Sequence, residues 1–414
     1  MKLELDELML DHDIGAMLVL GNGQHNPPMV YLTGGGHILN ALLIKKRGQA
    51  PILFHGPMER DEAARTGLST VSLSKYPLSA YLKDANGDRL RAQALRLKHI
   101  LADAGITSGK LALYGHGDIG RIYHELLALE RLSDITFDGD LNGQVLQKAA
   151  ATKDSEEIER IRKMAEITNR VVANTADFLS SCSVDSGKLV HPSGRPVTIG
   201  EVKQKINLWL AEAGAENPKG TIFATGRDAG IPHSSGTAAD ILEPGKTIVF
   251  DIFPCEPGGG YYYDFTRTWC LGYAPDEVVQ AHQHVFEVYQ KIVQDLEVGA
   301  LFSAYQAKTC ELFEARGHPT IRQQPDTEVG FVHSIGHGLG LNVHEKPFSG
   351  ATAGEDDRLI PGSVFTIEPG LYYPDKGFGV RIEDSYWVTP DHRFEKFTDF
   401  PYDLILPSRG VARR

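Results

Sequence analysis

"TIVFDIFPCEPGGGYYYDFTRTW", residues 247–269, contains two apolar runs rich in β-branched and aromatic residues, separated by a turn rich in proline and glycine. Such runs predict two strands, and the short connection between them predicts an antiparallel hairpin. Asp251 stands inside the first strand and Asp264 inside the second, so the hairpin brings two carboxylates to one face of a sheet. Buried ionised carboxylates need a partner. The hairpin therefore requires a bound cation, or one of its two acids must be protonated.

Two further acids recur in the same setting. Glu368 lies in "FTIEPG" and Glu383 lies in "VRIEDS", both within runs that predict strands. Glu383 shares a strand face with Arg381 because side chains alternate with a period of two. Taken alone, each acid is equally well explained by a salt bridge to Arg267 or Arg381. Four such acids in one half of the chain favour a shared cation site.

A histidine adds a nitrogen donor to this set. His337 lies between glycines in "HSIGHGLGLNVHEKP", residues 333–347, where the backbone can approach its surroundings closely. Four carboxylates and one neutral imidazole sum to −4, the charge that two divalent cations cancel. Oxygen-rich ligation with one nitrogen favours Mn²⁺, Co²⁺, Fe²⁺ or Zn²⁺. Two such ions about 3.5–4 Å apart share a water whose pKa falls to about 7, which predicts a hydroxide nucleophile for an amide carbonyl.

The remaining patterns predict two domains. In residues 1–145, short apolar runs alternate with helix-like stretches, as in an α/β domain. Asp154 and Glu157 have the spacing of a capping box, so a second domain is expected over residues 150–414. Its tightly joined strands favour an α+β fold with a largely antiparallel curved sheet. Helices are expected at 155–180, 200–214, 276–296 and 300–317, and strands at 247–253, 261–269, 363–373 and 379–389.

Composition narrows the class of protein. A length of 414 residues suits two domains, and 54 acidic against 42 basic residues give a net charge of −12, which disfavours a nucleic-acid partner. No apolar run approaches the ~20 residues of a membrane span, and the N-terminus does not resemble a signal peptide. Without CxxC spacing, the cysteines are expected to be buried free thiols in a reducing cytoplasm. They are Cys182, Cys255, Cys270 and Cys310.

The five donor positions and their contexts resemble the pita-bread metallopeptidases, the family of methionine aminopeptidase, aminopeptidase P, prolidase and creatinase. The resemblance covers residues 150–400 strongly. It covers residues 1–145 more loosely through "YLTG", "ALLI" and "LFHG", which look like the creatinase-type N-terminal domain. The resemblance implies a pita-bread catalytic domain of the proline-peptidase and creatinase branch. The matched metal ligands are Asp251, Asp264, His337, Glu368 and Glu383.

The resemblance also implies roles for residues around these ligands. His344 matches a histidine that contacts substrate near the scissile bond, and His233 in "GIPHSSG" matches an active-site histidine on a loop before the hairpin. Without the resemblance, His233 is better explained as a solvated loop residue. Arg381 resembles the arginine that orients a ligating carboxylate. Glu368 is expected to act both as a ligand and as a base toward the bridging water, whereas His333 is expected to be structural.

The implied reaction is hydrolysis of the Xaa-Pro bond of small peptides, with two divalent ions, Mn²⁺ first and Co²⁺, Zn²⁺ or Fe²⁺ as alternatives. The chain length and two-domain plan favour a prolidase-like dipeptidase slightly over aminopeptidase P. A dipeptidase needs a cation for the free carboxylate of proline, and the segment after His344 offers Lys346 and Arg358. Relatives with this N-terminal domain are usually dimers, which implies a homodimer.

Some features leave alternatives open. Asp264 follows Asp251 by thirteen positions, a little more than is usual in the family, so that Tyr261 or Tyr262 is a further candidate for the cleft. Related domains also serve as non-catalytic binding modules, as metal-free creatine hydrolases or as lyases. The five retained ligand positions count against the binding module and the metal-free hydrolase.

Overall fold

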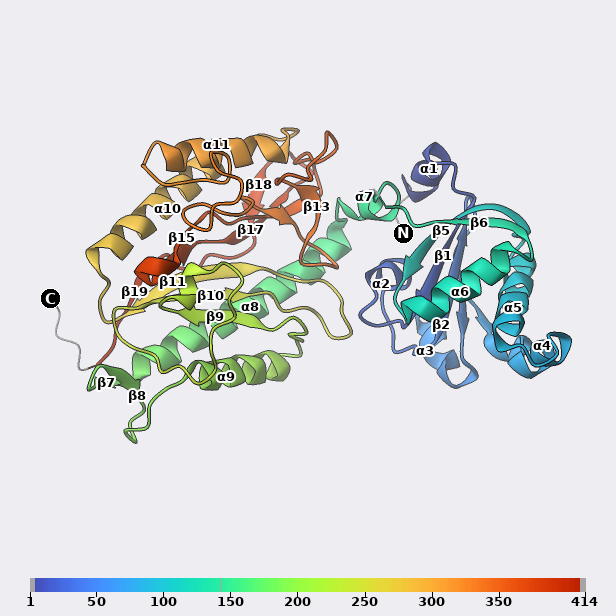
Figure 1. Ribbon diagram of the computed structural model, residues 1–414, viewed down its shortest axis with the longest axis horizontal. Helices are drawn as coiled ribbons and strands as arrows, with labels where there is room; N and C mark the ends of the chain where they lie inside the picture. Colours follow the sequence, from blue (N-terminus) through green and yellow to red (C-terminus); the bar gives the residue numbers. More distant parts are fainter. Residues whose placement is uncertain (1–3, 142, 410–414) are drawn as a thin grey trace. The chain divides into compact units, whose positions relative to one another are not determined.

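A computed structural model describes residues 4–141 and 143–409, and the chain forms two compact units (Figure 1). The first unit comprises residues 1–150 together with 258–260, and the second comprises residues 151–257 and 261–414. Each unit has its own sheets and its own buried apolar clusters.

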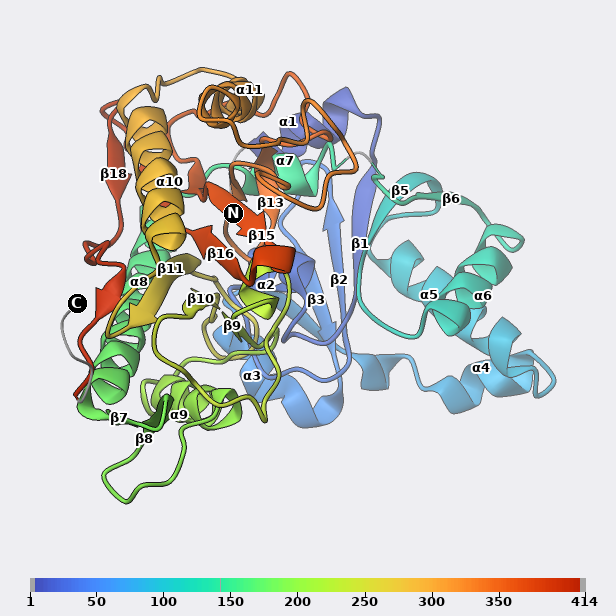
Figure 2. The same ribbon diagram turned by 60° about the vertical axis from the view of Figure 1, so that its left-hand side comes forward.

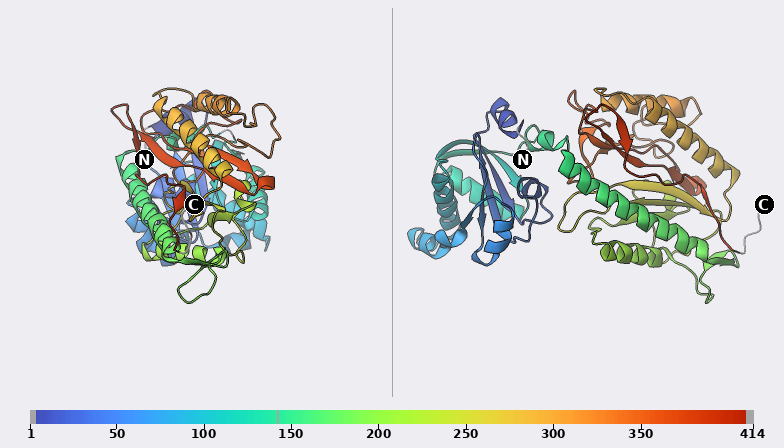
Figure 3. Two further views of the ribbon diagram at one scale, coloured as in Figure 1. Left: turned by 90° about the vertical axis from the view of Figure 1, so that its left-hand side faces the viewer. Right: turned by 180° about the vertical axis from the view of Figure 1, so that it is seen from behind.

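The first unit is built on a mixed six-stranded sheet with helices on both faces (Figure 3). The strand order is β4-β3-β2-β1-β5-β6, with β1 antiparallel to β2 and parallel to β5. Within β1, Met17 and Val19 join the core on one face, while Ala16 and Leu18 join the core on the other. A strand buried on both faces needs a continuous apolar run, which explains "AMLVLG".

The elements of the first unit are the strands β1 (Ala16–Gly21), β2 (Ala41–Lys46), β3 (Ile52–His55), β4 (Ser69–Ser72), β5 (Ser108–Gly115) and β6 (Asp134–Asp138). Its α-helices are α1 (Glu4–Asp11), α2 (Pro27–Thr33), α3 (Arg60–Arg65), α4 (Leu78–Asp84), α5 (Arg89–Asp103), α6 (Ile119–Glu130) and α7 (Leu146–Ala150). Two short 3₁₀ helices are η1 (Pro57–Glu59) and η2 (Leu73–Lys75).

The second unit contains two larger sheets that are mostly antiparallel. One has the strand order β19-β11-β10-β9 and the other β13-β12-β14-β17-β18, and β15 pairs with β16 separately. A bridge between Thr266 and Glu383 connects β11 to the segment between β16 and β17. Helices α8 and α9 pack against each other and against the four-stranded sheet (Figure 3). Helix α10 packs against β14, β15 and β16, and helix α11 packs against α10 and β13 (Figure 2). Both helices contribute side chains to the main core of the unit.

The helices of the second unit are α8 (Ser155–Ser181), α9 (Ile199–Glu212), α10 (Asp276–Gln294) and α11 (Phe302–Glu314), with η3 (Asp228–Gly230) and η4 (Pro374–Lys376). Its first strands are β7 (Ser183–Asp185), β8 (Lys188–Val190), β9 (Thr221–Thr225), β10 (Thr247–Ile252), β11 (Phe265–Leu271), β12 (His337–Gly338) and β13 (Glu345–Phe348). Its last strands are β14 (Val364–Ile367), β15 (Gly370–Tyr373), β16 (Phe378–Arg381), β17 (Asp384–Val388), β18 (Phe394–Lys396) and β19 (Ile405–Leu406).

The start of α8 confirms the predicted capping box. The Asp154 side chain accepts hydrogen bonds from the backbone N–H groups of Glu156 and Glu157, and the Glu157 side chain accepts one from the Asp154 N–H. This reciprocal pair satisfies N–H groups that the first helical turn leaves unbonded. All four helices predicted for the second half are present, within a few residues of their expected ends.

The strand predictions need correction where the acids lie. The run 363–373 is two strands, β14 and β15, separated at Glu368 and Pro369, because proline has no N–H to donate to a ladder. The run 379–389 is also two strands, β16 and β17, so Glu383 lies between strands and does not share one with Arg381. Asp264 immediately precedes β11. Of the four acids, Asp251 alone lies within a strand.

The structure also bears on the state of the cysteines and on membrane-spanning helices. All four cysteines are buried and free, as expected from their spacing. Within residues 4–141 and 143–409, no helix combines the length and apolarity needed to cross a bilayer.

Candidate metal centre and active site

The predicted hairpin is present, with β10 antiparallel to β11 and Asp251 opposite Thr266. Asp251 Oδ2 accepts a hydrogen bond of 2.6 Å from Arg381 Nη2. Asp251 Oδ1 is buried and has no hydrogen-bond partner among the described residues. Burying a carboxylate oxygen without a partner costs free energy. Asp251 Oδ1 is therefore available to bind a cation.

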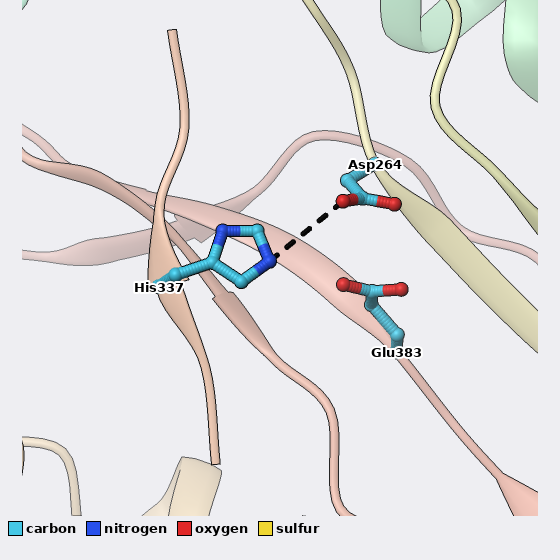
Figure 4. Close-up of side chains that lie close together, drawn as sticks. All are labelled: Asp264, His337 and Glu383. Atoms are coloured by element: carbon cyan, nitrogen blue, oxygen red, sulfur yellow. Dashed lines mark ion pairs between the residues drawn. The ribbon is translucent and has the colours of Figure 1, made fainter. Parts of the chain in front are cut away.

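Three side chains converge beside this hairpin, as Figure 4 shows for Asp264, His337 and Glu383. One donor atom from each lies within 4.8 Å of the others, and all three residues are buried. His337 Nε2 lies 3.8 Å from Asp264 Oδ2. Glu383 Oε2 accepts a hydrogen bond of 2.7 Å from Thr266 Oγ1, which fixes the orientation of its carboxylate.

Glu368 completes the group. Its Oε1 lies 3.3 Å from His337 Nε2, and its Oε2 lies 3.9 Å from His333 Nδ1. A cavity of about 650 Å³ in the second unit is lined by this residue and the other predicted donors. The structure thus brings together all five residues that the sequence analysis singled out as ligands, namely Asp251, Asp264, His337, Glu368 and Glu383.

In the protein without bound metal ions, the negative charge of each acid makes ionisation of its neighbours less favourable. Burial, followed by the charges of Asp251 and Glu368, raises the pKa of Asp264 well above its usual value. Burial and the same neighbours, with Asp264, raise the pKa of Glu383 well above its usual value. Burial also raises the pKa of Glu368 to about 8, although Arg381 lowers it. A bound dication reverses this effect because it favours the ionised carboxylates. The oxygen-rich donor set and the bare Asp251 oxygen therefore fit divalent cations.

His337 presents the correct nitrogen to this group. Its Nδ1 lies 3.1 Å from the carbonyl oxygen of Gly338, which can only accept, so Nδ1 carries the proton and Nε2 faces the acids with a lone pair. Burial, followed by the neighbouring His344, lowers the pKa of His337 to about 3. A Cβ atom at Gly336 would lie 2.0 Å from the Thr366 carbonyl oxygen, so the close approach predicted for this segment requires glycine.

Arg381 links the acid cluster to two aromatic groups. Besides Asp251, it donates from Nη1 to Tyr372 Oη at 2.7 Å. Tyr372 Oη lies 2.8 Å from His333 Nε2, and His333 Nδ1 lies 2.7 Å from the Ser334 carbonyl oxygen. Both ring nitrogens of His333 are therefore engaged, although His333 lines the cavity. Tyr372 was missed by the sequence analysis because no local pattern distinguishes it from an ordinary strand tyrosine.

The two predicted substrate histidines also lie at the cavity. His233 and His344 are among its lining residues. The rings of His344 and His337 are 4.2 Å apart at their centroids and nearly perpendicular. Burial lowers the pKa of His344, and the charges of Lys219 and His233 lower it further.

Four other candidates lie away from the cavity lining. Tyr261 is buried and donates to Glu157 Oε1 at 2.5 Å, and neither it nor Tyr262 lines the cavity. Lys346 forms an ion pair with Asp357 at 3.2 Å, and Arg358 donates to the Gly299 carbonyl oxygen at 2.8 Å. Neither cation lines the cavity, and the lysines that do are Lys203 and Lys219.

Comparison with known proteins identifies the family. The family model described as metallopeptidase family M24 matches residues 159–390, more than half of the chain. The chain belongs to metallopeptidase family M24. The five oxygen- and nitrogen-bearing side chains at the cavity all lie within the matched residues.

Two curated relatives and one solved structure illustrate the similarity. A probable dipeptidase PepE of Mycobacterium tuberculosis is 30% identical over 262 residues, 63% of this chain and 62% of that protein. An Xaa-Pro dipeptidase of Pyrococcus furiosus is 30% identical over 247 residues, 59% of this chain and 62% of that protein. The matched regions thus span about 62% of these relatives. A prolidase structure from Pyrococcus horikoshii aligns over 97% of this chain and 99% of that chain, with a TM-score of 0.73 and 22% identity. The fold is therefore the two-domain pita-bread fold.

Proposed function

We propose that this protein is a metal-dependent peptidase that hydrolyses the Xaa-Pro bond of small peptides, and that it acts as a dipeptidase. The observation that carries the proposal is the convergence of four buried or nearly buried acids and one neutral imidazole on a single cavity. The relatives named as dipeptidases support the substrate class.

The metal ligands in this proposal are Asp251, Asp264, His337, Glu368 and Glu383. They would hold two divalent ions, with Mn²⁺ the first candidate, because four carboxylates and one imidazole balance a charge of +4 and are rich in oxygen. When bound, such ions supply Lewis-acid polarisation of the scissile carbonyl and lower the pKa of a water.

The chain's own residues supply the proton handling. Glu368, beside His337 Nε2, accepts the proton of the attacking water. The departing proline nitrogen has no N–H as a tertiary amide, so it must gain a proton as the bond breaks. His233 and His344 line the cavity and are placed to bind the substrate and handle this proton. Arg381 holds Asp251 through the 2.6 Å contact, which keeps that carboxylate oriented.

We also propose a domain organisation, an oligomeric state and a cellular compartment for this protein. Residues 150–414 form the catalytic domain, residues 1–145 form the creatinase-like N-terminal domain, and the protein works as a cytoplasmic homodimer. Four buried free thiols support a reducing compartment. Light scattering of the full chain tests the dimer, because a monomer at micromolar concentration contradicts it.

A peptide panel tests the activity. Protein loaded with Mn²⁺ is incubated with Ala-Pro, Ala-Pro-Ala and creatine, and released products are quantified by chromatography. The proposal expects proline from Ala-Pro and little cleavage of the tripeptide. Cleavage of the tripeptide as fast as the dipeptide would instead indicate an aminopeptidase, and turnover of creatine alone would indicate a non-peptide hydrolase.

A further inference from the structure

The cavity has a positively charged wall that the metal-ligand set does not explain. Lys203 of α9 and Lys219, which precedes β9, line the same cavity as the acid cluster. Lys203 Nζ donates to the Ser235 carbonyl oxygen at 2.5 Å, and Lys219 Nζ lies 5.8 Å from the centre of the Tyr262 ring. In the described parts of the chain, neither lysine forms an ion pair with a carboxylate. Both charges are therefore available to a ligand.

The positions of Lys203 and Lys219 in the cavity strengthen their attraction for an anionic ligand. Burial lowers the pKa of Lys203, so its ammonium group is partly desolvated and gains more from a counterion than one in water. Lys219 lines the same cavity as His233 and His344. The two lysines thus place positive charge in the same cavity as these two histidines.

The rest of the cavity leaves these lysines without an internal counterion. Arg381 is paired with Asp251, and the other acids belong to the proposed metal set. Once two dications balance the four carboxylates, the positive charges left on the cavity wall are those of Arg381, which is held by Asp251 and Tyr372, and of Lys203 and Lys219. Apolar side chains also line the cavity, including Ile222, Phe253 and Val343, and provide contact surface for an uncharged ring. A substrate with one apolar ring and one anionic group complements this wall.

We propose that Lys203 and Lys219 bind the carboxylate of the substrate and so set the enzyme's preference for anionic peptides. The proposal rests on the proposed peptidase function and deepens it by assigning residues to the anion. It replaces Lys346 and Arg358, which are engaged with Asp357 and a backbone carbonyl away from the cavity. The C-terminal carboxylate of an Xaa-Pro dipeptide supplies the required anion, and an acidic side chain in the first residue is the other source of the same chemistry.

The test compares charged and neutral peptides with a double variant. Lys203→Gln combined with Lys219→Gln removes both charges, and Lys205→Gln is the matched control. Lys205 lies on the same helix, but its Nζ is 4.6 Å from the centre of the Phe178 ring and it does not line the cavity. The four substrates are Ala-Pro, Ala-Pro amide, Glu-Pro amide and Gln-Pro amide, assayed with Mn²⁺-loaded protein. Circular dichroism checks that each variant folds.

Hydrogen bonds to charged groups are worth about 1.5–3 kcal/mol, which corresponds to roughly ten- to hundredfold in affinity. The double variant is therefore expected to lose about tenfold or more in kcat/KM for Ala-Pro, mainly through KM, and less than about twofold for Ala-Pro amide. Lys205→Gln should change neither. A selective loss for Glu-Pro amide relative to Gln-Pro amide would assign the lysines to a side-chain carboxylate instead.

Equal losses on all four peptides, or no loss on any, would overturn the assignment. Failure of the wild-type protein to cleave any of the four would refute the proposed function rather than the charge preference. In that case, calorimetry measures the affinity of Ala-Pro and of Ala-Pro amide for the wild-type and doubly substituted proteins. The difference in affinity between the two peptides tests the charge preference without any cleavage. Equal affinity of the wild type for the two peptides would contradict it.

Discussion

Replacing Glu368 with glutamine is expected to stabilise the metal-free protein at neutral and alkaline pH, although it removes a proposed ligand. The pKa of Glu368 is about 8 in the folded protein, against an ordinary value of 4.5. Since the folded state binds this proton more tightly, the metal-free wild type is most stable below pH 4.5 as far as this group is concerned. Stability falls as the pH rises toward 8, because the unfolded chain ionises first.

The size of the effect follows from the interval between 4.5 and 8. Each pH unit within it corresponds to about 1.4 kcal/mol, so Glu368 costs the folded protein about 3 kcal/mol at pH 7 and about 5 kcal/mol above pH 8. Glutamine has the same shape and no charge, so most of this cost disappears. For a unit of this size, 1 kcal/mol shifts the melting temperature by about 2–4 °C, which predicts a rise of roughly 6–12 °C at pH 7.

The assay is thermal and urea unfolding of chelator-treated protein from pH 5 to 8.5, with Glu355→Gln as the control because Glu355 is exposed. Wild type and control should lose stability across this range, and Glu368→Gln should lose less, because Asp264 and Glu383, whose pKa values are also raised, still contribute to the loss. Added Mn²⁺ should stabilise the wild type more than Glu368→Gln, since bound cations neutralise the carboxylates whose ionisation destabilises the metal-free cluster. A variant that is less stable than the wild type at every pH, or that keeps the wild-type pH slope, would refute the reasoning.

Three further changes have defined outcomes. Asp264→Ala should lower kcat/KM for Ala-Pro at least about a hundredfold with an unchanged circular dichroism spectrum, and full activity would contradict its assignment as a ligand. His344→Ala should lower kcat about 10²–10⁴-fold without changing the unfolding midpoint, as measured by steady-state kinetics and urea unfolding. Asp384→Asn should destabilise the protein by about 3–5 kcal/mol in urea, because it leaves the buried Arg267, 2.9 Å away, without its counterion.

Much of the second unit could be predicted because its signals are local. The capping box at Asp154 depends on residues three positions apart, and the hairpin carrying Asp251 depends on two apolar runs and the turn between them. The four acids were singled out because acids within apolar runs are physically unusual, and the structure brings them, with His337, to one cavity.

The misplaced details depend on contacts between distant parts of the chain. Glu383 falls between two strands because it bridges to Thr266 of β11, a pairing that no local pattern encodes. Lys219 precedes β9 and lies at the cavity in the folded second unit, where β9 pairs with β10. Lys346, by contrast, has the right charge in the right segment, but Asp357 pairs with it.

The most direct test of the central claim is anomalous X-ray diffraction from crystals of the protein loaded with Mn²⁺. The account predicts two manganese peaks about 3.5–4 Å apart, surrounded by the carboxylates of Asp251, Asp264, Glu368 and Glu383 and by His337 Nε2. Absence of manganese from this group at saturating Mn²⁺, with the acids protonated or neutralised by Arg381 alone, would contradict it.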